Sequence, residues 1–206
     1  MKRYLSILLA FLLMLTGCKS KVPDLRTNST VSTLKLKKQE VEMLEFLFDD
    51  FFAFDIKIDK KCKGIEISCD EYSFESDEFI SNNKYKTDII LANDKITNGE
   101  IIFSLNRLSN DNSISLSYAL KLDKSITKTD QLCSIGQIPS IAFESYKAKN
   151  IASPLRQSRN GEFIFFAVVL DEDNNVIIEY NIKDPDKIPE NLDKSSKTFI
   201  VKARLF

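Results

Sequence analysis

Residues 160–170, NGEFIFFAVVL, determine the fold predicted for this chain, because they join a turn signal directly to a long apolar run. Asn160-Gly161 favours a type I′ turn, in which both central residues need positive φ. Glu162 to Leu170 follows, rich in the aromatic and β-branched residues that favour strands. A run with so few polar positions is typical of a strand covered on both faces. We therefore expect this strand and the next apolar run, up to Ile178, at the centre of a sheet.

Alternation with a period of two repeats on either side of this stretch. Apolar residues occupy every second position in the segments 52–58, 65–67, 114–122 and 199–205. A second turn signal, Asn98-Gly99, precedes an apolar run from Glu100 to Leu105, and Ser109 to Asn112 predicts the next turn. Short strands joined by polar turns predict an α+β fold, mostly antiparallel β-sheet, arranged as a meander or sandwich.

One or two helices complete this prediction. Apolar residues recur at helical spacing between Lys38 and Asp50, and acidic residues there supply a charged side. The Phe residues that follow could equally turn the later half of this segment into strand. Pro139 to Asn150 is the second candidate helix, and Leu34 to Leu36 is a candidate first strand.

The chain begins with a segment of a different kind. Met1-Lys2-Arg3 is positively charged, and Tyr4 to Leu15 is uncharged and apolar. As a helix this apolar run spans about 18 Å, short of the ~30 Å hydrocarbon core of a bilayer, so a cleavable signal is favoured over a spanning helix. Leu15-Thr16-Gly17-Cys18 follows and resembles the lipobox of bacterial lipoproteins.

The resemblance covers this segment only, and it implies a cellular location. In bacterial lipoproteins the signal is cut before the cysteine, here between Gly17 and Cys18, and acyl chains such as palmitate anchor that residue stably in a bilayer. Lys19 stands where Asp retains enterobacterial lipoproteins in the inner membrane, so the inner leaflet of the outer membrane, facing the periplasm, is favoured. We expect a signal peptide at 1–17, a lipidated Cys and polar tether at 18–37, and one β-rich domain at 38–206.

Composition excludes several classes of function. Two of the 29 basic residues and none of the 30 acidic ones lie in residues 1–17, so 27 basic and 30 acidic residues remain and the mature net charge is −3. A nucleic-acid-binding protein would carry a basic excess. The chain has no His, which excludes Ser-His-Asp and Cys-His catalysis and His-ligated zinc. We predict a protein that is not an enzyme and needs no cofactor or metal.

Three matches to functional motifs are interpreted as chance. Asp171 to Asn175 starts like a calcium loop, but Val176 occupies the position where an EF-hand needs Gly, and a hairpin turn is favoured. Ser81-Asn82-Asn83-Lys84 and Ser125-Ile126-Thr127-Lys128 match Ser-x-x-Lys, the nucleophile motif of penicillin-binding enzymes. Neither opens a helix, and no Lys-Thr-Gly follows.

Besides the lipidated residue, the mature chain contains Cys62, Cys69 and Cys133. In an oxidising envelope we expect two of them to form a disulfide and one to remain a thiol. If Ile65 to Ser68 is a strand, Cys62 and Cys69 lie roughly 23 Å apart, far beyond the ~4.4–6.8 Å between the Cα atoms of a disulfide, and Cys133 must be one partner. If the segment is a tight loop, Cys62 and Cys69 can pair with each other.

Acidic residues interleaved with aromatic ones form a candidate partner-binding segment. Its members are Glu66, Asp70, Glu71, Tyr72, Phe74, Glu75, Asp77 and Glu78. One interpretation is a solvated strand face. The other is a docking surface for a basic partner, which the aromatic residues would anchor and the carboxylates would steer.

The hypothesis that joins these expectations is a membrane-anchored periplasmic lipoprotein that binds another protein. Its most concrete form is an immunity protein that neutralises a periplasm-acting toxin, as in type VI secretion. The alternative is a structural or assembly lipoprotein subunit of a cell-envelope or secretion machine. A toxin gene next to this one would favour the first, and a cluster of machine genes would favour the second.

Replacing Cys18 tests the predicted anchor. Cys18→Ser removes the thiol that would carry the lipid, so palmitate labelling should be lost and the protein should leave the membrane fraction. Intact mass and membrane fractionation measure both effects. Unchanged mass and unchanged membrane retention in the variant would exclude the lipoprotein assignment.

Overall fold

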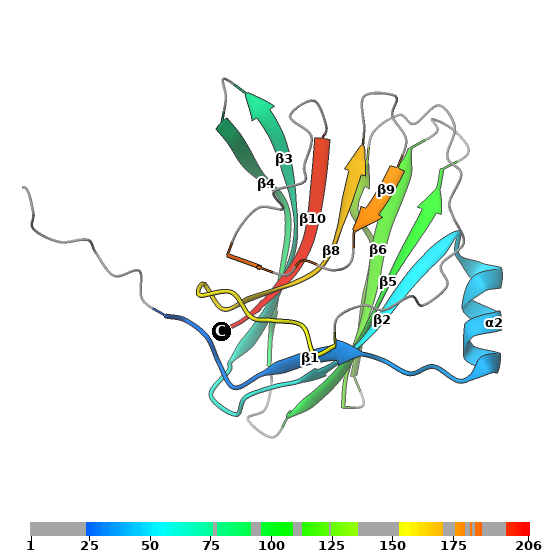
Figure 1. The fold of residues 1–206 in the computed structure, drawn as a ribbon. Helices are drawn as coiled ribbons and strands as arrows, with labels where there is room; N and C mark the ends of the chain where they lie inside the picture. Colours follow the sequence, from blue (N-terminus) through cyan, green and yellow to red (C-terminus); the bar gives the residue numbers. More distant parts are fainter. Residues whose placement is uncertain are drawn as a thin grey trace, which may run out of the picture.

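The strands of this protein form two five-stranded antiparallel sheets packed face to face (Figure 1). The computed structural model describes residues 24–75, 78–91, 96–108, 113–123, 125–135, 153–170, 176–179, 182, 184–186 and 197–206. This architecture confirms the predicted α+β fold, mostly antiparallel β-sheet. The candidate helix at 139–150 lies outside the described residues.

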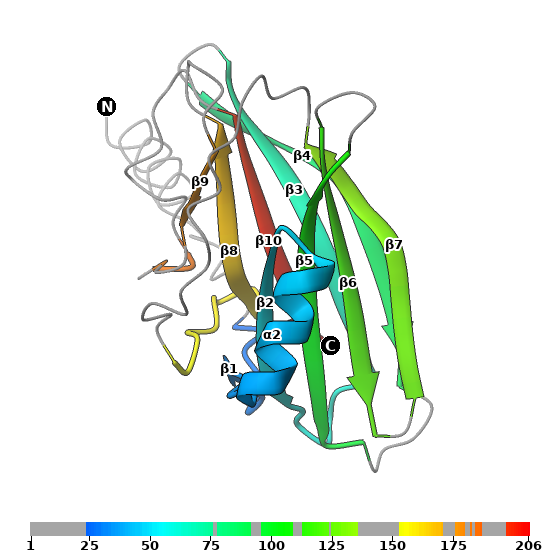
Figure 2. The same ribbon diagram turned by 90° about the vertical axis from the view of Figure 1, so that its right-hand side faces the viewer.

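Each sheet joins strands that are consecutive in sequence to strands from distant parts of the chain. Sheet A has the order β1 (Thr30–Thr33), β2 (Asp50–Lys57), β5 (Asn98–Arg107), β6 (Ile114–Leu122), β7 (Ser125–Ile135). Sheet B has the order β4 (Glu78–Ile90), β3 (Gly64–Glu75), β10 (Lys197–Leu205), β8 (Glu162–Leu170), β9 (Val176–Glu179). The helix α2 (Lys38–Leu47) lies on the outer side of sheet A, beside β2 (Figure 2).

A cluster of aromatic rings fills the space between the sheets. Phe103 of β5 contacts Phe54 of the neighbouring strand at 6.3 Å between ring centroids, and Phe165 and Phe166 of sheet B at 4.8 and 5.5 Å. The register of β8 against β10 shifts at this point, because Val201 lies opposite Phe166 and Lys202 opposite Ile164. A β-bulge of this kind re-aims a side chain. It allows two consecutive Phe residues to pack against sheet A.

The two Asn-Gly signals have different outcomes. At Asn160-Gly161 a turn forms, since Gly161 has φ +79° and its N–H donates to the carbonyl of Ser158 at 3.0 Å. The predicted type I′ geometry is wrong, because Asn160 does not have the positive φ that this type needs at both central residues. The turn predicted at Asn98-Gly99 is wrong, because both residues belong to β5. An added Cβ on Gly99 would lie 2.7 Å from Cδ2 of Leu122. This glycine therefore serves close packing between strands.

The boundary predicted between tether and domain needs correction. Thr30–Thr33 pairs antiparallel with β2, and Val31 is fully buried. The backbone N–H of Leu25 also donates to the carbonyl of Arg159 at 2.8 Å. Residues from Leu25 onward are thus part of the folded domain, and the first strand precedes the Leu34–Leu36 segment. Residues 18–23 lie outside the described part of the chain.

The helix ends at Leu47, so it is shorter than the predicted Lys38–Asp50 segment. The alternative, strand in the later half of that segment, is wrong, because strand β2 begins only at Asp50. At the N-terminus of the helix, the backbone N–H of Lys37 donates to Oε2 of Glu40 at 2.7 Å. In the described ranges, no helix is long and apolar enough to cross a membrane.

The run predicted at the centre of a sheet is only partly central. Strand β8 lies between β10 and β9, whereas β9 is an edge strand. The two pair antiparallel with Leu170 opposite Val176, as a hairpin requires. Residues 171–175, which join them, lie outside the described residues.

Truncating Phe103 should test the aromatic cluster. Phe103→Ala leaves a cavity between the sheets, so we expect a loss of about 3–5 kcal/mol in the free energy of unfolding. Phe46 is 88% exposed, and Phe46→Ala should change stability by no more than about 0.5 kcal/mol. Urea unfolding followed by circular dichroism measures both. Equal losses in the two variants would contradict this description of the core.

Candidate partner-binding site

The helix α2 exposes most of its large apolar side chains. Met43, Phe46 and Leu47 are 58%, 88% and 54% exposed, and Leu44 is the one buried residue of the helix. Because residues three and four positions apart share one face of a helix, these three side chains are neighbours. Contiguous exposed apolar residues mark interaction sites more often than scattered ones.

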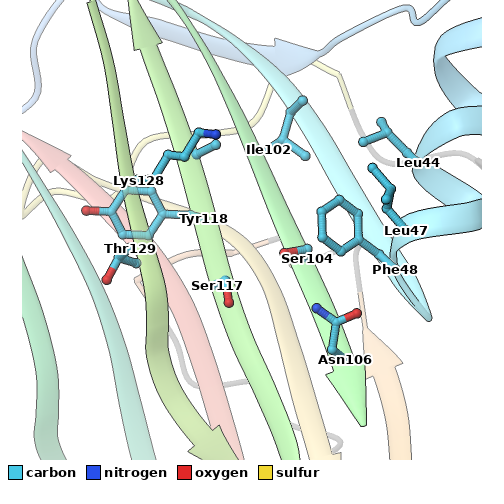
Figure 3. A pocket seen from close by; sticks show the side chains of 11 residues that line it. Leu44, Leu47, Phe48, Ile102, Ser104, Asn106, Ser117, Tyr118, Lys128 and Thr129 are labelled. Atoms are coloured by element: carbon cyan, nitrogen blue, oxygen red, sulfur yellow. The ribbon is translucent and has the colours of Figure 1, made fainter. Parts of the chain in front are cut away.

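A groove runs between α2 and the outer face of sheet A, with a volume of about 340 Å³ (Figure 3). The wall on the helix side consists of Leu44, Leu47 and Phe48. The remaining lining residues come from the sheet: Ile102, Ser104, Asn106, Ser117, Tyr118, Ala119, Lys128 and Thr129.

Small side chains on the outer face of sheet A account for the groove. Ser104 of β5 lies opposite Ser117 of β6, and Ile102 lies opposite Ala119. Serine and alanine do not reach far enough from the sheet to fill the space beside the helix. The groove is therefore apolar on the helix side, with small polar groups in its floor.

Carboxylates outnumber basic groups on α2 and directly after it. Glu40, Glu42, Glu45 and Asp49 are all exposed on α2 or directly after it. Glu42 makes an ion pair with Lys38 at 3.6 Å, and Oδ2 of Asp49 accepts a hydrogen bond from the backbone N–H of Arg107 at 2.6 Å. An apolar face with an acidic rim suits a partner that offers an apolar side chain among basic ones.

The acidic segment predicted to bind a partner is divided by the structure. Its inner carboxylates, Glu66 and Asp70, are buried on strand β3. Lys202 of β10 lies between two carboxylates, 2.7 Å from Asp70 and 2.9 Å from Glu162. Glu66 pairs with Arg204 at 2.8 Å. These inner carboxylates are neutralised within the molecule and do not present a free acidic surface.

Two opposing effects set the pKa values in this ionic cluster. Burial raises the pKa of Glu66. The hydrogen bond with Lys86 and the nearby charge of Arg204 together lower it by more than burial raises it, so the net shift is downward. For Lys202, burial lowers the pKa while hydrogen bonds to Asp70 and Glu162 raise it, and the net shift is upward. Both groups therefore stay charged at neutral pH, as mutually compensating ion pairs require.

The outer part of the acidic segment lies on an overhanging hairpin. Pairing of β3 with β10 ends at Tyr72, whereas pairing of β3 with β4 continues to Glu75 opposite Glu78. Figure 1 shows this hairpin projecting beyond its neighbours. Glu71, near its base, pairs with Lys197 at 3.9 Å. The side chains of Phe74, Glu75 and Glu78, and all of Asp77, lie outside the described part of the chain.

The three described cysteines settle one alternative. Ile65 to Ser68 belongs to strand β3, so the tight loop that would let Cys62 pair with Cys69 is wrong. The Sγ atoms of Cys69 and Cys133 lie 3.1 Å apart, and Sγ of Cys62 lies 3.6 Å from Oγ of Ser29. All three are buried thiols. Gly17 and Cys18 lie outside the described residues.

Neither Ser-x-x-Lys match opens a helix, and residues 171–175 of the calcium-loop match lie outside the described residues. Both Ser-x-x-Lys matches lie on strands, β4 and β7. Side chains three positions apart on a regular strand point to opposite faces, so Ser125 and Lys128 do not converge. Among the described residues, no group of three or more Cys, Asp or Glu could hold a metal ion.

Comparison with protein-family models, with curated proteins and with solved structures gave no match.

The exposure of α2 was not expected from the sequence. Helical spacing of apolar residues normally marks the face that packs on a core. Here the helix is ten residues long, and only Leu44 is buried. The exposure of the helix could have been predicted from the composition of strands β5 and β6. Ser and Ala at their outward positions give a helix little apolar surface to cover.

Asp50, at the junction of α2 with β2, provides a test of this region. It is 3% exposed, and its Oδ1 accepts a hydrogen bond from the backbone N–H of Phe51 at 2.8 Å. Burial raises its pKa from 3.8 to about 6, despite that hydrogen bond. The folded protein therefore binds this proton more tightly than the unfolded chain, and stability falls as the pH rises from about 4 through about 6.

Asp50→Asn removes the buried charge and can keep the hydrogen bond to Phe51. We expect the variant to be more stable than the wild type above pH 6, by up to about 3 kcal/mol at the conversion of 1.36 kcal/mol per pKa unit. The two proteins should converge in stability near pH 4. Denaturant unfolding at pH 4 and pH 8 measures the difference. The same difference at both values would show that folding does not raise the pKa of Asp50.

Proposed function

We propose that this protein is a membrane-anchored lipoprotein of the bacterial envelope that binds another protein, and that the partner docks on α2. The observation that carries the proposal is Phe46, which is 88% exposed on a helix beside a groove of about 340 Å³. Aromatic side chains in the centre of an interface commonly supply much of its binding energy. The lipobox resemblance at Leu15-Thr16-Gly17-Cys18 supports the envelope address.

The charges around this face favour a protein partner over a lipid surface. A helix that lies in a membrane interface carries Lys and Arg on its polar face, which attract anionic lipids. The polar positions here are mainly acidic: Glu40, Glu42 and Glu45 on the helix, with Asp49 directly after it. The proposed partner therefore presents an apolar side chain that enters the groove and basic groups that face the carboxylates.

The most concrete form of this proposal is an immunity protein that neutralises a periplasm-acting toxin, as in type VI secretion. Three observations support it. The chain has no His, it provides no metal cluster among the described residues, and its exposed apolar face suits sequestration of a partner. Inhibition by binding needs only a surface that covers the site or substrate path of the toxin.

Binding kinetics with the protein encoded by the neighbouring gene test this proposal. Phe46→Ser removes the apolar anchor, so we expect faster dissociation and a loss of about 2 kcal/mol or more in binding, roughly thirtyfold in Kd. Glu45→Lys reverses one rim charge, so we expect slower association at low salt and a weaker dependence of the rate on salt. Surface plasmon resonance on the immobilised partner measures both rates.

Matched changes on sheet B are the controls. Ile90 is an exposed apolar residue of β4, and Ile90→Ser should leave dissociation unchanged. Asp88→Lys changes the net charge by the same amount as the rim variant and should leave association nearly unchanged. If the α2 variants and their controls bind alike, the partner does not dock on α2. If the neighbour-encoded protein is neither bound nor neutralised, the immunity proposal is excluded and an assembly role takes its place.

A further inference from the structure

Cys69 and Cys133 meet across the two sheets. Cys69 lies on β3 of sheet B and Cys133 on β7 of sheet A, and both are fully buried. Their Sγ atoms are 3.1 Å apart, against the ~2.05 Å of a disulfide bond. About 1 Å of movement would therefore bring two buried sulfur atoms, 64 residues apart in the chain, to bonding distance.

The backbone also converges at this corner. Sheets that pack face to face lie about 10 Å apart on average, more than the ~4.4–6.8 Å between the Cα atoms of a disulfide, so the strands must approach each other locally for one to form. Strand β7 approaches β3 and β4 more closely, with residue pairs within 8 Å between Cα atoms. The two strands that carry these cysteines thus belong to a region in which the sheets approach each other closely.

Irregular pairing beside each cysteine is consistent with this convergence. The register between β3 and β4 shifts between Cys69 and Asp70. The register between β6 and β7 shifts directly after the pair of Leu116 with Cys133. β-Bulges bend the strand that carries them and increase its twist. Strands β4 and β7, which form the edges of the two sheets on this side, are thus irregular next to the point at which the sheets come together.

We infer that Cys69 and Cys133 form a disulfide that joins the two sheets when the chain folds under oxidising conditions, and that Cys62 remains a thiol. Cys62 lies elsewhere, where its Sγ is 3.6 Å from Oγ of Ser29 and its backbone N–H donates to the carbonyl of Asp59. Strand β3 separates it from Cys69. This arrangement gives the odd cysteine no sulfur partner among the described residues.

The bond forms by two thiol–disulfide exchanges with an oxidised dithiol protein or oxidised glutathione. One cysteine thiolate attacks the disulfide of the oxidant and displaces one of its sulfurs, giving a mixed disulfide. The second cysteine thiolate then attacks the protein sulfur of that mixed disulfide and displaces the other oxidant sulfur. The two cysteines lose two protons and two electrons in all, and the oxidant leaves as two thiols.

The burial of Cys69 and Cys133 determines when during folding the disulfide can form. The hydrogen bond with Cys133 and burial both raise the pKa of Cys69, and the thiolate is the reactive form. Neither sulfur is exposed once the sheets have closed. Exchange must therefore precede complete packing, and the reduced folded protein should resist oxidation.

Thiol mapping of the full chain tests this inference. The chain is purified in detergent, unfolded and reduced, and then refolded with oxidised and reduced glutathione. It is then alkylated in denaturant and digested without reduction. We expect one peptide pair linking Cys69 to Cys133 and alkylation of Cys62. Cys62→Ser should keep the linked pair, and Cys133→Ala should yield two alkylated thiols.

Stability gives a second measurement. A cross-link that closes a loop of this length should raise Tm on the order of 10 °C over the reduced protein. The reduced folded protein, treated with the same oxidant without unfolding, should form the bond at least tenfold more slowly than the refolding chain. A linked pair that contains Cys62, or three alkylated thiols after oxidative refolding, would overturn the inference.

Only the cellular setting of this bond rests on the proposed envelope address. Acid-quenched cells, alkylated in denaturant, report the state of the thiols in the cell. If the bond forms during refolding but the protein from cells has three reduced thiols, the sheet-to-sheet disulfide stands and the proposed export to an oxidising compartment is excluded.

Discussion

The structure depends on one aromatic contact between its two sheets. Phe103 of sheet A packs against both Phe165 and Phe166 of sheet B, and the bulge in β8 makes this double contact possible. An aromatic side chain buries more apolar surface than any aliphatic residue, so a few rings can hold two sheets together. The outer faces are then free to differ. Sheet B carries a buried ionic cluster, and sheet A carries a helix with an exposed apolar face.

This division of roles explains why the inner acidic residues are not the favoured binding surface. Glu66 makes ion pairs with Arg204 of β10 and Lys86 of β4, and Asp70 makes one with Lys202 of β10. A buried ion pair must be matched closely to offset the cost of removing its charges from water. Their charge serves the pairing of strands. A partner gains more from α2, where apolar atoms already face solvent and carboxylates are exposed.

Much of the fold could be predicted from local patterns, and most of the site could not. Alternation in β2, β6 and β10, and the apolar run of β8, were sufficient to predict strands, because each buries one face in a shared core. Strands β4 and β7 are edge strands with many polar positions, so no apolar period marks them. Ion pairs such as Lys202 with Asp70 join residues more than a hundred positions apart. Strand order sets such pairs, and no local spacing shows them.

The hydrogen bond between Leu25 and Arg159 would limit how far the folded domain stands from a membrane under the proposed lipid anchor. Leu25 is already fixed to the carbonyl of Arg159, and with the lipid on Cys18, as proposed, seven residue steps join that contact to the bilayer. Even a fully extended chain covers at most ~3.6 Å per residue, or about 25 Å. The tether between lipid and domain would therefore be short. Under that proposal, the end of the sandwich that carries Leu25 and the turn at Gly161 would be held beside the lipid headgroups, and the flanks and the far end would be the approaches open to a large partner.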